Sequence, residues 1–301
     1  MNTIQFIEDH IPAVAKLCRQ ALEKDIMPDF LLTEKTVLDP DFDSKLTYIV
    51  KSDQGDVIAF IMGVVRDRGN EKIGYIKLFC VHENFRRNGI GRKLYNLIES
   101  EFKGRGIKKV RLFESWPNYY QPGIDPFYTE AVCFFERMKF VRNGDTSNLT
   151  ADLSASDFDT SAEEKELQKQ QIEINRASHN EFENTMAYID KFFPAWRGEV
   201  SAAFKNSPVS LHIAKLDGEI RAFSAHEVNN IGTGWFGPMG TDPVFRGKGV
   251  GGILLKRCLK DMKEAGFAKA IIPWVGPIPF YMHYCNSKVS RVFWKYEKIL
   301  E

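Results

Sequence analysis

Two short segments of this sequence place arginine and glycine at the same spacing. Residues 246–251 read RGKGVG and residues 86–91 read RRNGIG, so both follow the pattern Arg-x-x-Gly-x-Gly. Because glycine has no Cβ atom, successive backbone N–H groups in such a loop can point at one anion, and the arginine adds positive charge beside it. Where the loop leads into a helix, the helix N-terminus also favours negative charge. Both segments therefore predict loops that bind phosphate groups.

The second segment also matches the glycine pattern of dinucleotide-binding turns, because Gly247, Gly249 and Gly252 spell Gly-x-Gly-x-x-Gly. Its context differs from that of such turns. In a Rossmann fold the first glycine follows the strand at once, whereas residues 242–246 intervene here. The first segment has no third glycine, and the next strand, expected over 269–275, is apolar and has no acidic end. These differences argue against a dinucleotide site.

The elements around the two loops follow the same order. An apolar, strand-like run precedes each loop (75–81 and 234–241), and an amphipathic helix follows it (93–106 and 253–266). Each helix ends at a glycine and leads into another strand, and each half of the chain begins with a strand, a helix and a hairpin. Repetition of this whole layout predicts two domains of the α/β (α+β) class.

The composition between the two repeats predicts where the domains end. Residues 144–168 are polar and contain few apolar side chains after Leu153, and residues 149–153 are expected to form the last strand of the first half. We therefore expect one domain over 1–153, a linker with a short helix over 154–169 and a second domain over 170–301.

The bulk composition excludes several classes of partner. The formal net charge is +1, so no global field favours nucleic acid or an anionic membrane. The five cysteines are scattered without CxxC spacing, which is typical of reduced thiols in a cytoplasmic protein and indicates no metal site. No apolar run has the length of a membrane span, and the N-terminus does not read as a signal peptide.

Two copies of Arg-x-x-Gly-x-Gly in matching context resemble motif A of the GNAT superfamily of acetyl-CoA-dependent N-acetyltransferases, in tandem form. The resemblance covers nearly the whole chain and implies two domains, each with a mixed, mostly antiparallel central sheet flanked by helices. It also implies that the bound phosphate is the pyrophosphate of acetyl-CoA, and that the strand before the loop diverges from its neighbour to pair with the pantetheine arm. In the second half the implied cofactor-binding residues are Met239, Gly240, Thr241, Arg246, Gly247, Lys248, Gly249, Val250, Gly251 and Gly252. A second site in the first half would use Phe79, Cys80, Val81, Arg86, Arg87, Gly89 and Gly91.

The same resemblance implies different roles for the two halves. Many family members carry a Phe-Tyr pair on the helix after the fifth strand, and the tyrosine protonates the leaving thiolate of coenzyme A. The second half has this pair at Phe280 and Tyr281, whereas Phe135 takes the matching place in the first half. Because phenylalanine has no proton to donate, we expect the second half to be catalytic and the first to be degenerate or structural.

A general base for the acceptor amine is harder to assign. The strand before the second loop has no acidic residue or histidine, so the candidates are His226, Glu227 and Asp242. His226 and Glu227 alternate along a strand, so only one of them can face the cleft. We favour Glu227.

The acceptor is expected to be a small-molecule amine. Flat aromatic faces with few charges suit a sugar ring, and the second half carries such side chains near the expected cleft: Trp196, Trp235, Trp274, Phe280 and Tyr281. The segments QPGID (121–125), IIPWVGPIPFY (271–281) and VFWKY (292–296) resemble bacterial N-acetyltransferases that act on glucosamine and related glucosaminides. A peptide N-terminus, a polyamine or an antibiotic are alternative acceptors, and a non-catalytic sensor of coenzyme A is an alternative function. We expect a monomer.

Overall fold

The computed structural model describes residues 1–301, the side chain of Val244 excepted. The chain forms two compact units: unit 1 comprises Met1–Thr146 and Phe293–Glu301, and unit 2 comprises Ser147–Val292. The boundaries expected at residues 153 and 170 divide the chain into consecutive segments. The two units are instead defined by tertiary contacts, and each includes a strand segment from the other half of the sequence.

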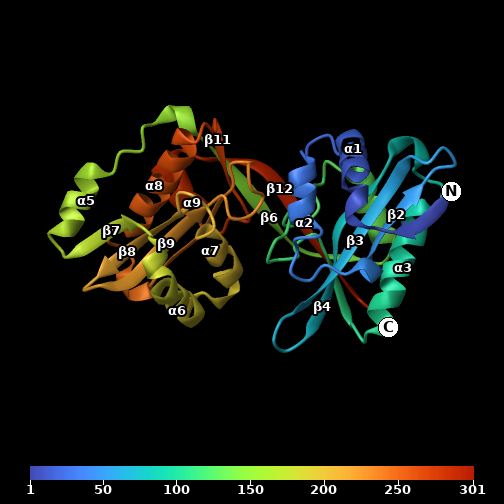
Figure 1. Ribbon diagram of the computed structural model, residues 1–301, viewed down its shortest axis with the longest axis horizontal. Coiled ribbons are helices and arrows are strands. Elements are labelled where there is room, and N and C mark those ends of the chain that lie inside the picture. The colour runs from blue at the N-terminus through green and yellow to red at the C-terminus, as the bar shows by residue number, and fades with distance from the viewer. The chain divides into compact units, whose positions relative to one another are not determined.

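Unit 1 is built on a sheet in which β1 to β5 lie in chain order and the end of β12 pairs with β5. All neighbours are antiparallel except β4 and β5, which run parallel. The strands are β1 (Asn2–Gln5), β2 (Thr47–Lys51), β3 (Val57–Asp67), β4 (Lys72–Val81), β5 (Lys109–Leu112) and β12 (Lys288–Ile299). The helices are α1 (Ile11–Ala21), α2 (Asp29–Lys35), α3 (Ile90–Gly104) and α4 (Thr129–Arg137), the first three of which are labelled in Figure 1.

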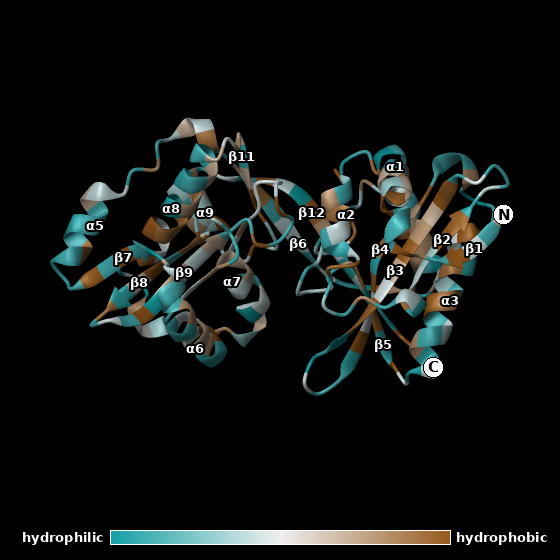
Figure 2. Cartoon of the chain, viewed as in Figure 1, coloured by the Kyte–Doolittle hydropathy of each residue, from teal (hydrophilic) through white to brown (hydrophobic). Residues whose placement is uncertain are grey.

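The core of unit 1 lies on both faces of this sheet. Val14, Leu17 and Cys18 of α1 recur at the three- and four-residue spacing of one helix face and pack in one buried cluster with β3 and β4. The buried side chains of α3 and α4 form a second cluster with the same strands. Apolar residues accordingly run along β2 and β3 (Figure 2).

Unit 2 repeats this arrangement with an antiparallel sheet of order β10-β9-β8-β7. Its helices α6 and α7 pack on one face, and α8 packs on the other. The strands are β7 (Ile172–Arg176), β8 (Leu211–Leu216), β9 (Glu219–His226), β10 (Phe236–Thr241) and β11 (Lys269–Ile272). The helices are α5 (Ser161–Gln168), α6 (Phe182–Phe192), α7 (Arg197–Ala203), α8 (Val250–Glu264) and α9 (Ile278–Cys285).

The strand expected over residues 149–153 is longer and pairs differently from the expectation. It belongs to β6 (Val141–Asp152), which starts in unit 1 and ends in unit 2, where residues 149–152 pair antiparallel with β11. Residues of β12 return to unit 1 and pair Glu297 with Arg111 of β5. Hydrophobic patterning identifies such strands but does not specify which sheet edge each one joins.

Candidate active site

The two predicted phosphate loops have nearly the same backbone. Gly89 caps α3 at φ 77° and ψ −5°, and Gly249 caps α8 at φ 78° and ψ −7°. This left-handed conformation favours glycine, which also supplies no capping side chain to occupy the first helical N–H groups. Gly247 (φ 81°) and Arg87 (φ 62°) are left-handed at the matching earlier position. Both helix starts therefore present backbone donors that can bind an anion.

The second glycine of each loop packs against the same kind of surface. A Cβ atom on Gly251 would lie 3.5 Å from Phe280 and 3.6 Å from Met239. On Gly91 it would lie 3.1 Å from Phe79 and 3.4 Å from Phe134. These glycines let the first turn of the helix approach the strand before the loop and the helix that carries the aromatic pair.

The third glycine of the second loop has a separate explanation. A Cβ atom on Gly252 would lie 2.1 Å from the ring of Tyr284, so the side chain of Tyr284 occupies the space beside the first turn of α8. The first loop has Arg92 at this position. Gly252 thus makes room for a ring of this chain, a role that the sequence motif does not reveal.

The strand before each loop leaves its parallel neighbour. In unit 1, β4 pairs with β5 from Ile73 to Ile76 and then continues alone on that side to Val81. In unit 2, a parallel β-bridge between the two corresponding segments joins Trp235, just before β10, to Ile271 of β11. Over Met239–Thr241, β10 pairs with β9 on its other edge. Each unit therefore contains a wedge between two strands that leads towards the phosphate loop.

Tyr281 lies on α9 and is buried, with 8% of its surface exposed. Its ring centre is 6.1 Å from that of Phe236 at the start of β10 and 5.1 Å from that of Phe280. Burial raises the pKa of Tyr281 to about 12, so the phenol keeps its proton near neutral pH. Phe135 has the matching place in unit 1 and packs against Phe79 and Phe134.

The three candidate bases have different partners. Glu227 directly follows β9, and its carboxylate accepts hydrogen bonds from the N–H groups of Gly232 (2.5 Å) and Trp235 (2.6 Å). Burial raises the pKa of Glu227, although these two N–H groups act in the opposite direction. His226 turns to the α8 side of the sheet, where its Nε2 lies 3.2 Å from Asp261, and Asp242 lies 3.6 Å from Arg221.

The predicted acceptor aromatics fall into more than one cluster. Phe280, Tyr281 and Phe236 share a buried cluster with α8 and β11. Trp196 instead stacks on Phe193 at 5.4 Å and belongs to the core beneath α6 and α7. Trp274 lies between β11 and α9, where its backbone N–H donates to Asn148 Oδ1 at 3.0 Å.

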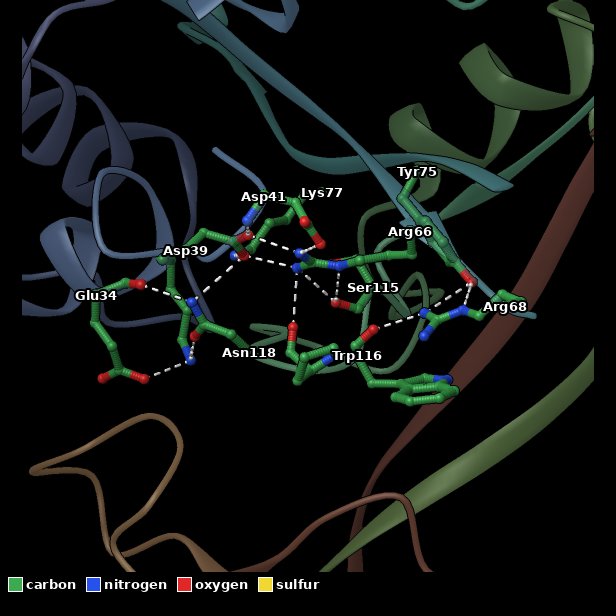
Figure 3. A network of polar contacts seen from close by, with 12 residues as sticks. Glu34, Asp39, Asp41, Arg66, Arg68, Tyr75, Lys77, Ser115, Trp116 and Asn118 are labelled. Atoms are coloured by element: carbon green, nitrogen blue, oxygen red, sulfur yellow. Dashed lines mark hydrogen bonds and ion pairs between the residues drawn. The ribbon is translucent and has the colours of Figure 1, made fainter. Parts of the chain in front are cut away.

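A buried polar network in unit 1 was not identified from the sequence (Figure 3). Arg66 of β3 donates to both carboxylate oxygens of Asp39, at 2.7 and 2.6 Å, and Lys77 of β4 pairs with the same carboxylate. Asn118 adds a longer contact to Asp39 at 3.4 Å. The sequence feature that points to this network is the lysine within the apolar run YIKLFCV (75–81).

In the described part of the chain, no cluster of three or more histidine, cysteine, aspartate or glutamate side chains is arranged to hold a metal ion. Across the same residues, no helix has both the length and the apolar character required to cross a bilayer.

Comparisons with known proteins define the class to which this fold belongs. The model of the acetyltransferase (GNAT) family matches residues 17–122 and 170–281, which together make up most of the chain. The protein therefore belongs to the GNAT acetyltransferase family, whose members use acetyl-CoA, and it contains two such domains in tandem. The predicted family and fold class are confirmed. No curated protein matches the sequence.

Solved structures with the same fold are distant in sequence. A glucosamine N-acetyltransferase region of a fungal multi-domain β-N-acetylglucosaminidase is 18% identical, with a TM-score of 0.82 over 99% of this chain. This chain spans only 38% of that fungal protein. An N-acetyltransferase from Sphaerobacter thermophilus is 16% identical (TM-score 0.72; 99% of this chain and 95% of that one). A tandem GNAT protein from the clavulanic acid pathway is 12% identical (TM-score 0.69; 99% and 98%).

Proposed function

We propose that this protein is an acetyl-CoA-dependent N-acetyltransferase and that its chemistry takes place in unit 2. One observation carries the assignment to unit 2. The two units share the phosphate-loop backbone and the wedge between strands, but Tyr281 in unit 2 offers a buried proton donor where Phe135 in unit 1 offers none.

The cofactor is expected to bind along β10 and α8. Backbone N–H groups of residues 247–252 hold the pyrophosphate, and Arg246, which is exposed, adds charge beside it. The unpaired edge of β10 at Met239–Thr241 pairs with the pantetheine arm, which directs the thioester towards Tyr281. Unit 1 supplies a second loop at residues 86–91, with Val81, Arg86, Arg87, Gly89 and Gly91, that would bind the same group.

The reaction follows from these positions. Glu227 takes a proton from the acceptor amine, whose nitrogen then attacks the thioester carbonyl carbon. A backbone N–H group of the diverging strand stabilises the oxyanion. As the carbon–sulfur bond breaks, Tyr281 gives its proton to the thiolate, and the second proton lost by the attacking nitrogen restores the phenol, so that the products are a neutral N-acetyl amide and coenzyme A.

We propose an amino sugar such as glucosamine as the acceptor. Fold similarity to a fungal glucosamine N-acetyltransferase region supports this class, but fold alone does not specify a substrate. Phe280, whose ring centre lies 5.1 Å from that of Tyr281, supplies flat aromatic surface beside the proposed proton donor. A peptide N-terminus, a polyamine or an antibiotic is the alternative acceptor class.

Substitution of Tyr281 tests the assignment of the active unit. Thiol release from acetyl-CoA with glucosamine should fall about 10²-fold or more in Tyr281→Phe, because the proton donor is lost. Binding of acetyl-CoA, measured by calorimetry, should be unchanged. Tyr284→Phe, one helical turn further along α9, is the matched control and should keep its activity. Full turnover in Tyr281→Phe would contradict the assignment, and no turnover of any amine by the wild type would favour a sensor.

A further inference from the structure

A lysine and a glycine occupy matching positions in the two units. The pairing of β3 with β4 shifts register after Ile76, and the pairing of β9 with β10 shifts register after Phe236. The residue that follows is Lys77 in unit 1 and Gly237 in unit 2. Each begins a bulge, which is a place where a strand redirects a side chain.

Both positions lie at the opening of the wedge between the diverging strands. Ile76 makes the last pair between β4 and β5, so Lys77 is the first residue beyond that pairing. Gly237 follows Trp235, which bridges β10 to β11, by two residues. In the proposed function this is the region where the thioester meets the acceptor amine.

Lys77 is completely enclosed by unit 1. Its exposed fraction is 0%, and its Nζ pairs with Oδ2 of Asp39, which is also fully buried at the side chain. Arg66 holds the same carboxylate through two nitrogens, and Figure 3 shows the three side chains pointing toward one another. A buried primary ammonium group with a carboxylate partner therefore occupies the bulge.

Unit 2 leaves the matching place open. A Cβ atom built on Gly237 would meet no atom within 4 Å, and the residue has φ 104°, which disfavours any side chain there. The same strand position thus carries a lysine side chain in unit 1, whereas in unit 2 it carries no side chain and the space at its Cβ position is open.

We propose that Lys77 fills the acceptor-amine position of unit 1 with its own ammonium group, and that Asp39 and Arg66 form a latent binding site for a primary alkylammonium ion. The assignment of this position to the acceptor amine rests on the proposed function, but the proposed ammonium-binding site does not. The contacts explain why unit 1 can keep a cofactor loop and still be closed to external amines. Burial lowers the pKa of Lys77 to about 7 despite Asp39, as expected for an amine sealed from water.

Removal of the lysine side chain should create the binding site without leaving Asp39 unpaired. In Lys77→Ala, Arg66 still donates to both oxygens of Asp39, so the variant should fold with reduced stability. Added n-propylammonium, which has the three carbons and the nitrogen that alanine lacks, should then raise its Tm in a saturable way. At ten times its Kd the ligand increases the folded-to-unfolded ratio about tenfold. Lys77→Ser offers the same test if the alanine variant is insoluble.

Two controls separate an amine site from a simple cavity. n-Propanol has a similar chain without the charge and should stabilise Lys77→Ala much less than n-propylammonium does. Lys77→Met fills the space with an uncharged side chain and should gain nothing from the amine. Equal rescue by alcohol and amine, equal rescue of Lys77→Met, or no rescue of the alanine or serine variant would overturn the proposal. Because these measurements need no acetyl-CoA, their outcome is independent of the Tyr281→Phe test of the proposed function.

Discussion

At the scale of single residues, the candidate site uses burial to prepare two groups for proton transfer. Burial raises the pKa of both Tyr281 and Glu227. For the tyrosine this keeps the proton that, in the function we propose, passes to the leaving thiolate. For the carboxyl group it moves the pKa in the direction of neutral pH, where a general base works best. Burial therefore favours the protonated form of both groups, although a phenol and a carboxyl group start from very different pKa values.

Glu227→Gln tests the residue that we propose as the base. Glu227 must be ionised to accept a proton, so kcat/KM should rise as pH increases through its raised pKa and level off above it. Glu227→Gln should lower kcat by about 10²-fold or more and remove this acidic limb from the pH profile. If Glu227 only stabilises the turn over 227–235, the variant would lose thermal stability while the acidic limb persisted.

At the scale of elements, glycine decides how closely α8 approaches its neighbours. Gly249 is required by its left-handed backbone, whereas Gly252 is required by the ring of Tyr284. A sequence motif counts both glycines in the same way. Only the packing of α9 against α8 separates an anion-binding role from a steric one.

Gly252→Ala should lower the free energy of unfolding by about 1–3 kcal/mol, because its Cβ atom would overlap the ring of Tyr284 and force a local shift. Thermal unfolding measures this loss. Adding Tyr284→Met, which copies Met138 at the corresponding place in unit 1, should recover most of it. The matched control is Gly104→Ala in α3, whose Cβ atom would meet nothing within 4 Å and should have little effect. An unchanged Tm in Gly252→Ala would contradict this packing.

At the scale of the whole molecule, the two halves of the sequence are not the two units. Residues 293–301 belong to unit 1, where Glu297, Lys298 and Ile299 pair with β5. Residues 147–152 belong to unit 2, where residues 149–152 pair with β11. Each unit therefore depends on a strand from the other half of the chain.

Deletion of residues 293–301 should destabilise unit 1 although it removes the end of the second half. β5 would lose a neighbour, so amide hydrogen exchange should accelerate at Lys109–Leu112. The strands β8 and β9 serve as the internal control and should keep their protection. Faster amide hydrogen exchange in β8 and β9, with unchanged exchange in β5, would contradict the assignment of residues 293–301 to unit 1.

The sequence by itself determined the family, the repeated order of elements and the position of both glycine-rich loops. Those features depend on local chemistry: glycines that adopt left-handed backbone, arginines beside them and apolar residues at helical or strand spacing. The short helix in the predicted linker and the helices after both loops also follow from local pattern.

Tertiary structure alone decided which sheet receives β6 and β12, why Gly252 is a glycine and what surrounds Lys77. Strand partners, ring contacts and buried ion pairs join residues that are far apart in the chain, and their free energy comes from desolvation and packing. Lys77 illustrates the difference, because along the sequence it is one polar residue in an apolar strand. Its role depends on its ion pair with Asp39, which Arg66 also holds, and only the folded sheet brings these residues together.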